Sequence, residues 1–226
     1  MNLEGVHLIG NHSEKPGYSK FFAYNPETGE KINPSFGDAT EADINKGLLL
    51  ASRSFPLYRQ KSGPERAKFL TAIAEEIEKL GDALLSCCHL ETALPLARLE
   101  GERNRTINQI RLFADLIEND RWRDIRTDQI KKDGDLPDIH LAYYRIPLGP
   151  VAVFGASNFP LAFSVAGGDT ISALAAGCPV IVKAHFSHPG TSEMVGKAIL
   201  SAANRTGMPE GVFSMFHGQS NQVGMD

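Results

Sequence analysis

Two polar residues stand at the ends of apolar segments, where side chains of their types could contact a ligand. Asn158 follows the run Val151–Phe154 in the turn Gly155–Pro160, and Lys183 ends the run Pro179–Lys183. An amide in such a turn can donate a hydrogen bond to an oxygen that gains negative charge during a reaction. A lysine ammonium can contact a ribose hydroxyl or a phosphate as a point charge.

The segments around these residues predict how they are positioned. Val151–Phe154 and Val180–Lys183 have the length and branching of buried strands. Between them, Pro160 is placed to open a helix that we expect to end at Gly177. Strand, helix and strand form a βαβ unit with a right-handed crossover, whose ligands sit beyond the C-terminal ends of the strands. The sequence therefore predicts both polar residues at one edge of a sheet.

Periodicity and turn residues predict the other elements. We expect short strands and turns over 1–36, helices over 40–54, 65–84 and 95–119, a connection over 121–137, a strand over 138–146, a helix over 190–207 and a third parallel strand over 211–216. The predicted fold is α/β, with an N-terminal helical portion (1–137), a β-ribbon segment (138–149) and the first half of a Rossmann-like parallel sheet (150–226). Three parallel strands alone would leave open edges, so we expect the chain by itself to be poorly soluble.

Composition excludes several classes of protein. The net charge of the 226 residues is −4, which does not favour binding to nucleic acid or to an anionic membrane. The N-terminus lacks the pattern of a signal peptide, and no apolar stretch is long enough to span a membrane. The three cysteines, Cys87, Cys88 and Cys178, have no disulfide or metal spacing, so we expect a reducing, cytoplasmic location.

Other motifs in the sequence give weaker evidence of function. Gly155–Phe159 resembles the hydrolase elbow G-x-S-x-G, but Phe159 replaces the second glycine that the motif needs. No G-x-G-x-x-G fingerprint is present. His185 and His188 lack a nearby carboxylate or thiol, so we expect no metal site. Cys178 enters a strand at the end opposite the expected ligand crevice, and we interpret it as structural, like Cys87 and Cys88 in their amphipathic helix.

The motifs PLGPVAVFGASNFPLAF (147–163) and AGCPVIVKAH (176–185) resemble the aldehyde dehydrogenase superfamily. With Glu91–Arg103 and His188–Ser192, they look most like the branch that oxidises 2-oxoglutarate semialdehyde (2,5-dioxopentanoate). The resemblance covers this chain and the N-terminal half of a typical member. It implies oxidation of an aldehyde to a carboxylate by NAD or NADP, through a cysteine thiolate and a glutamate base. Both residues would lie beyond Asp226.

The resemblance also implies roles for individual residues. Asn158 would stabilise the oxyanion of the thiohemiacetal, although an asparagine can also merely satisfy its own turn. The cofactor would contact Phe154, Ala156, Ser157, Lys183 and His185. Lys183 could equally reach into solvent, and a loop histidine is often just exposed. Phe186 replaces a glutamate that grips the ribose in many relatives, and 218–222 lacks an arginine found in NADP-preferring ones, so either cofactor remains open.

The substrate would meet Phe159, Phe163 and Arg111. The two phenylalanines line the aldehyde tunnel in the family, but they are equally typical of a core, and Arg111 can be a solvated helix residue. The family also implies a homo-oligomer that uses the ribbon segment. The main hypothesis is therefore the N-terminal part of an NAD(P)-dependent aldehyde dehydrogenase. The alternative is a catalytically inactive nucleotide-binding or interaction fragment.

Overall fold

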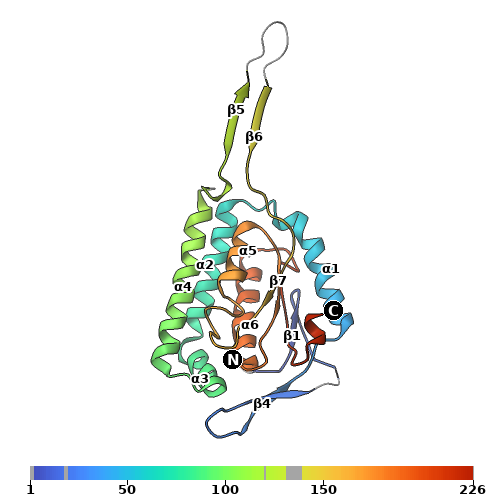
Figure 1. Ribbon diagram of the computed structural model, residues 1–226, viewed down its shortest axis with the longest axis vertical. Helices are drawn as coiled ribbons and strands as arrows, with labels where there is room; N and C mark the ends of the chain where they lie inside the picture. The colour runs from blue at the N-terminus through green and yellow to red at the C-terminus, as the bar shows by residue number, and fades with distance from the viewer. Residues whose placement is uncertain (1–2, 18–19, 120, 131–138, 226) are drawn as a thin grey trace.

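The computed structural model describes residues 3–17, 20–119, 121–130 and 139–225 (Figure 1). A five-stranded sheet in the order β2-β1-β9-β8-β7 lies at its centre. Its parallel part consists of β7 (Val151–Phe154), β8 (Val180–Lys183) and β9 (Phe213–Phe216). The antiparallel part is the N-terminal hairpin of β1 (His7–Ile9) and β2 (His12–Glu14), whose β1 pairs with β9. The mixed α/β fold with a parallel core is thus confirmed.

Helices cover both faces of this sheet. Along β8, Val180 and Val182 pack into the large core on the side of α5 (Gly168–Ala176) and α6 (Pro189–Thr206), while Ile181 packs on the opposite side with Ile44 of α1. A strand that is buried on both faces has a continuous apolar sequence, which is why β8 was recognisable in the sequence. The crossover through α5 places β8 beside β7, and the crossover through α6 places β9 on the far side of β8, so the three parallel strands lie in the order β9, β8, β7.

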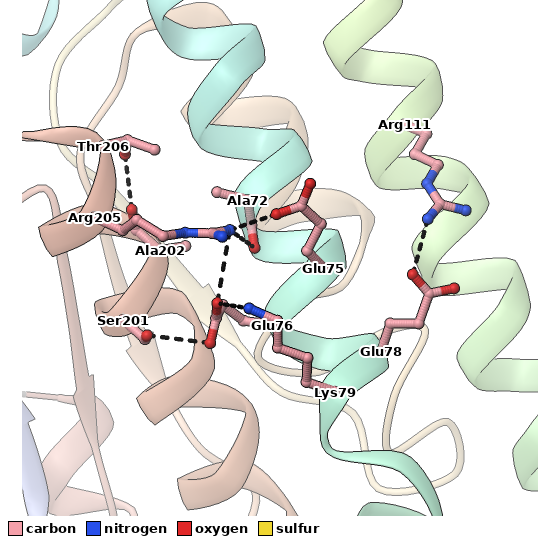
Figure 2. Close-up of polar contacts among 10 residues, drawn as sticks. All are labelled: Ala72, Glu75, Glu76, Glu78, Lys79, Arg111, Ser201, Ala202, Arg205 and Thr206. Atoms are coloured by element: carbon pink, nitrogen blue, oxygen red, sulfur yellow. Dashed lines mark hydrogen bonds and ion pairs between the residues drawn. The ribbon is translucent and has the colours of Figure 1, made fainter.

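Three N-terminal helices form a layer over α5 and α6 (Figure 1). They are α2 (Gly63–Lys79), α3 (Gly81–Thr92) and α4 (Leu96–Glu118). Helix α1 (Glu41–Tyr58) packs on the other face of the sheet, against β8 and β9. Thr40 with Asp43, and Ser62 with Glu65, form capping boxes that begin α1 and α2. On the surface between α2 and α6, Arg205 pairs with Glu75 and Glu76 (Figure 2).

Two helix boundaries differ from the prediction. Helix α1 continues past Ser54 and contains Pro56, and its last residue, Tyr58, is fully buried and donates a hydrogen bond to the Leu174 carbonyl at 2.8 Å. That anchor offsets the backbone hydrogen bond that a proline removes. The single helix expected over 65–84 is two helices, because Gly81 adopts a left-handed φ of 53°.

The helix expected from Pro160 begins only at Gly168, and residues 160–167 are turns. The reason is tertiary: a Glu102 oxygen on α4 accepts hydrogen bonds from the backbone N–H groups of Leu161 and Ala162 at 2.8 and 2.9 Å. The Glu102 side chain thus binds these two N–H groups, and the segment does not form a helix there.

Residues 126–130 and 139–143 form a two-stranded ribbon that extends away from the body (Figure 1). It pairs β5 (Arg126–Ile130) with β6 (Ile139–Tyr143) in antiparallel register. The strand within 138–146 is confirmed, but the connection expected over 121–137 is wrong at β5. Every β5 residue is exposed, so the strand shows no apolar alternation that the sequence could reveal. The boundary at 137/138 lies outside the described residues.

The remaining elements are short. A second hairpin pairs β3 (Phe21–Tyr24) with β4 (Lys31–Phe36), and 3₁₀ turns occur at Arg121–Arg123 and Gln222–Gly224.

Two buried glutamates connect distant segments: Glu91 of α3 accepts from Gly190 N–H and Thr191 N–H, and Glu193 of α6 accepts from Gly5 N–H at 2.8 Å. Burial raises the pKa of Glu91 to about 7. No described helix combines the length and apolarity needed to cross a membrane.

We expect the 226-residue chain on its own to self-associate through β7. The sequence predicted open edges on the three parallel strands, and the structure corrects this on one side, because β1 covers the outer edge of β9. Among the described residues, however, β7 pairs only with β8, so its other edge is unpaired, and Ala152 and Phe154 are exposed on one of its faces. Size-exclusion chromatography with light scattering should therefore detect oligomers, and Ala152→Lys should shift them towards monomer. Asn108→Lys on the exposed face of α4 is the matched control. A monodisperse wild-type monomer would contradict the expectation.

Candidate functional site

The turn after β7 carries the predicted amide. Gly155 N–H donates to the Lys183 carbonyl at 3.0 Å, and Ala156 N–H donates to the Phe163 carbonyl at 2.9 Å, which closes the loop between them. Asn158 lies at the exposed part of this loop. Its carbonyl accepts a hydrogen bond from Arg98 Nη2 at 2.9 Å. The backbone of Asn158 is therefore held from α4, while its side-chain amide is open to solvent.

Glu102 fixes the other end of the loop. Its side chain is buried, and one oxygen binds the two N–H groups of Leu161 and Ala162 described above. The other oxygen, Oε2, has no hydrogen-bond partner among the described residues. Sequence analysis did not identify Glu102, because a glutamate on a helix with many charged residues gives no sign that it faces inward.

The end of β8 places Lys183 beside β7, with Phe154 and Lys183 paired in register. The Lys183 ammonium donates to the Gly218 carbonyl at 2.7 Å. Partial burial lowers its pKa, which a nearby Asp38 partly counteracts. Because an ammonium has three N–H donors, it can bind a ligand while keeping this contact. A groove of about 310 Å³ along β7 is lined in part by Phe154 and Lys183.

His185 and His188 stack on each other with ring centroids 5.5 Å apart. His188 is buried, and its Nε2 donates to the Ala156 carbonyl at 2.9 Å, so it supports the loop. His185 is more accessible, and its Nδ1 accepts from Ser187 N–H at 3.2 Å, which leaves the proton on Nε2. Burial, with smaller effects of His188 and Lys183, lowers the pKa of His185 to about 4. It therefore offers a neutral N–H donor near Lys183.

Phe159 and Phe163 form an edge-to-face pair with centroids 5.3 Å apart. The Cζ atoms of Arg98 and Arg105 lie 5.3 Å from the Phe159 centroid and 5.0 Å from the Phe163 centroid, respectively. Both arginines come from α4 at a spacing of seven residues, which is two helical turns on one face. Neither was predicted as a site residue, although this spacing was visible in the sequence.

Arg111 lies elsewhere on α4. It follows Arg105 by six residues, so it points to another side of the helix. Its guanidinium forms an ion pair with Glu78 of α2 at 3.0 Å (Figure 2). The structure thus brings together the predicted residues of the β7 turn with Lys183 and His185, but it pairs Arg111 with another helix.

None of the three cysteines lies at the C-terminal ends of the parallel strands. Cys87 and Cys88 belong to α3, and burial raises both thiol pKa values to about 12. Cys178 is buried just before β8, at the end of the strand opposite Lys183. The described residues also contain no group of three potential metal ligands.

Comparisons with known proteins agree with one another. The sequence matches the aldehyde dehydrogenase family over residues 13–226. It is 51% identical over 226 residues to "Alpha-ketoglutaric semialdehyde dehydrogenase 2" of Azospirillum brasilense, covering 99% of this chain and 43% of the relative. It is 44% identical over 205 residues to "Alpha-ketoglutaric semialdehyde dehydrogenase" of Acinetobacter baylyi, covering 87% of this chain and 39% of the relative.

A solved structure shares the fold. An Escherichia coli protein described as an NADP-dependent enzyme superposes with a TM-score of 0.82 at 27% identity, covering 97% of this chain and 43% of that protein. The chain thus spans less than half the length of the relatives it matches. With a family match that includes both the turn after β7 and the end of β8, this chain belongs to the aldehyde dehydrogenase family.

Proposed function

We propose that the chain is the N-terminal part of an NAD(P)-dependent enzyme that oxidises an aldehyde to a carboxylate. The substrate proposed is 2-oxoglutarate semialdehyde, which two similar proteins are named for. The observation that carries the proposal is the exposed amide of Asn158 on a loop held at both ends, by Arg98 and by Glu102. A donor fixed before the reaction stabilises developing charge without the cost of reorganising during it.

In this proposal, Asn158 donates a hydrogen bond to the aldehyde oxygen as that oxygen becomes anionic. Phe159 and Phe163 flank the carbon chain with an apolar surface, of which Phe163 is 40% exposed. The turn resembles that of the aldehyde dehydrogenase family, which supports these roles. The side chain of Asn158 is also exposed, so a substrate can reach it.

The C-terminal ends of β7 and β8 fit a nicotinamide dinucleotide. The groove beside β7 is predominantly apolar, and at its end the Lys183 ammonium and the neutral His185 offer donors for ribose or phosphate oxygens. Phe154, Ala156 and Ser157 complete the proposed contacts from the neighbouring strand end. A bound NAD or NADP would accept the hydride from the aldehyde. We propose either cofactor, because Phe186 stands where many relatives have a ribose-binding glutamate.

The partners proposed are the aldehyde and further copies of the same protein. The β5–β6 ribbon exposes Leu141 and Tyr143, which favours its use as a subunit contact. We propose a cytoplasmic location on the basis of the cysteine content.

A catalytically inactive nucleotide-binding or interaction protein is the second candidate, favoured by the position of the cysteines. The DNA beyond the codon for residue 226 distinguishes the two candidates. A reading frame that continues into a segment with a cysteine at the site indicates the enzyme, whereas an immediate stop codon indicates the inactive protein.

We expect the isolated 226-residue chain to reduce neither NAD⁺ nor NADP⁺ in the presence of an aldehyde. An active thiolate must reach the substrate, and the three cysteines lie in α3 or at the far end of β8. The measurement is the aldehyde-dependent rise in absorbance at about 340 nm, which reports hydride transfer to the nicotinamide. Reduction that disappears in Cys178→Ala would show that this cysteine is the nucleophile instead of a structural residue.

In a complete enzyme that contains residues 1–226, we expect Asn158→Ala to lower kcat by about 10²–10³-fold, because one oxyanion donor is lost. Asn158→Asp should be at least as damaging, since it replaces the donor with a negative charge. The cofactor Kd should stay within about twofold, because the amide acts on the reacting oxygen. Asn204→Ala, at an exposed position of α6, is the control. A change in cofactor Kd with kcat intact would refute the oxyanion role.

A further inference from the structure

We propose that Arg105, assisted by Arg98, binds the carboxylate at the far end of the aldehyde substrate and so makes the site selective for anionic aldehydes. This inference rests on the proposed function and names a specificity determinant within it. It assigns to Arg105 the substrate contact that the family resemblance implied for Arg111.

The geometry places both guanidinium groups on the surface that flanks Asn158. Arg98 lies over Phe159, and Arg105 lies over Phe163, each within cation–π distance of its ring. The two rings contact each other edge to face. Arg98, Phe159, Phe163 and Arg105 therefore form one continuous strip, which we call the arginine–phenylalanine strip. It begins at Asn158, whose carbonyl is bound to Arg98.

Both arginines of this strip are exposed. Among the described residues, neither Arg98 nor Arg105 forms an ion pair with a carboxylate. Two other arginines do: Arg111 pairs with Glu78, and Arg205 of α6 pairs with Glu75 and Glu76 (Figure 2). Arg98 and Arg105 share one face of α4 with Glu102, whose buried carboxylate binds backbone N–H groups, so the two exposed guanidinium groups present the positive charge at the surface, where it can attract an anion.

The chemistry of the strip matches a short carbon chain that ends in a carboxylate. A guanidinium presents a planar set of donors that can bind both oxygens of a carboxylate. The phenylalanine rings lie between the arginines and can contact the methylene groups of such a chain. Stacking on the rings also restricts the guanidinium groups, so less conformational entropy is lost when a ligand binds.

The two arginines have different parts in this proposal. Arg98 already donates to the Asn158 carbonyl, so it also positions the loop. Arg105 has no such hydrogen bond among the described residues, and it lies over Phe163, four residues further along the loop than Phe159. Its guanidinium is therefore the one available to hold the distal carboxylate.

The test compares two aldehydes of similar length in a complete enzyme that contains residues 1–226. The anionic substrate is 5-oxopentanoate, and the neutral one is pentanal. We expect Arg105→Gln to raise KM for 5-oxopentanoate by about 10- to 100-fold, as for a lost hydrogen bond to a charged group. The KM for pentanal and both kcat values should change by about twofold or less.

Three further variants make the result specific. Arg105→Lys keeps the charge but loses the planar donors, so it should recover part of the affinity for 5-oxopentanoate. Arg98→Gln should raise KM for the anion and also lower kcat for both aldehydes, because it loosens the loop of Asn158. Arg53→Gln, at an exposed position of α1, should change nothing. The wild-type preference for the anion should weaken as ionic strength rises.

Several outcomes would overturn the inference. Equal losses with both aldehydes in Arg105→Gln would show a structural role. No change in Arg105→Gln, with an anion-selective loss in Arg111→Gln, would return the role to Arg111. If the wild type oxidises neither aldehyde, the proposed function fails, and calorimetry with glutarate decides the inference separately. Glutarate should then bind the wild type and not Arg105→Gln, with 1,5-pentanediol as the neutral control; absent or unchanged glutarate binding refutes the inference.

Discussion

The candidate site depends on a buried carboxylate that binds backbone N–H groups. Glu102 reaches from α4 to Leu161 and Ala162, directly after the residues that we propose for catalysis. Charge-assisted hydrogen bonds of this kind are strong, and a buried N–H left without a partner costs about 1–3 kcal/mol. The same device recurs at Glu91, which holds the start of α6, and at Glu193, which holds the segment before β1. These contacts connect α3, α4 and α6 to segments that are distant in the sequence.

The parallel sheet then brings the two halves of the site together. Adjacent parallel strands end at the same edge, so the pairing of Phe154 with Lys183 fixes how the turn after β7 lies beside the loop after β8. His188 strengthens this arrangement, because its ring crosses from the second loop to the Ala156 carbonyl of the first. A substrate at Asn158 and a cofactor at Lys183 would thus meet over β7.

Helix α4 contributes to the site in two ways. Glu102 points into the protein beneath the loop, while Arg98 and Arg105 lie over its aromatic rings. The helix that supports the loop therefore also supplies the charge beside it. The position of the Asn158 loop and the proposed substrate selectivity are therefore coupled, because a shift of α4 would move both the loop and the two arginines.

The sequence by itself determined the elements whose burial leaves a pattern. The apolar runs of β7, β8 and β9, the start of α1 at about residue 40, and the turn motif that carries Asn158 were all predicted, because each depends on neighbouring residues. Other features were decided by the tertiary structure, because they depend on residues that are distant in the sequence. The late start of α5 follows from Glu102, the extension of α1 through Pro56 follows from the burial of Tyr58, and β5 exists by pairing with β6 alone. Likewise, α4 presents Arg98 and Arg105 to the loop and Arg111 to Glu78, because helix packing sets which face meets which partner.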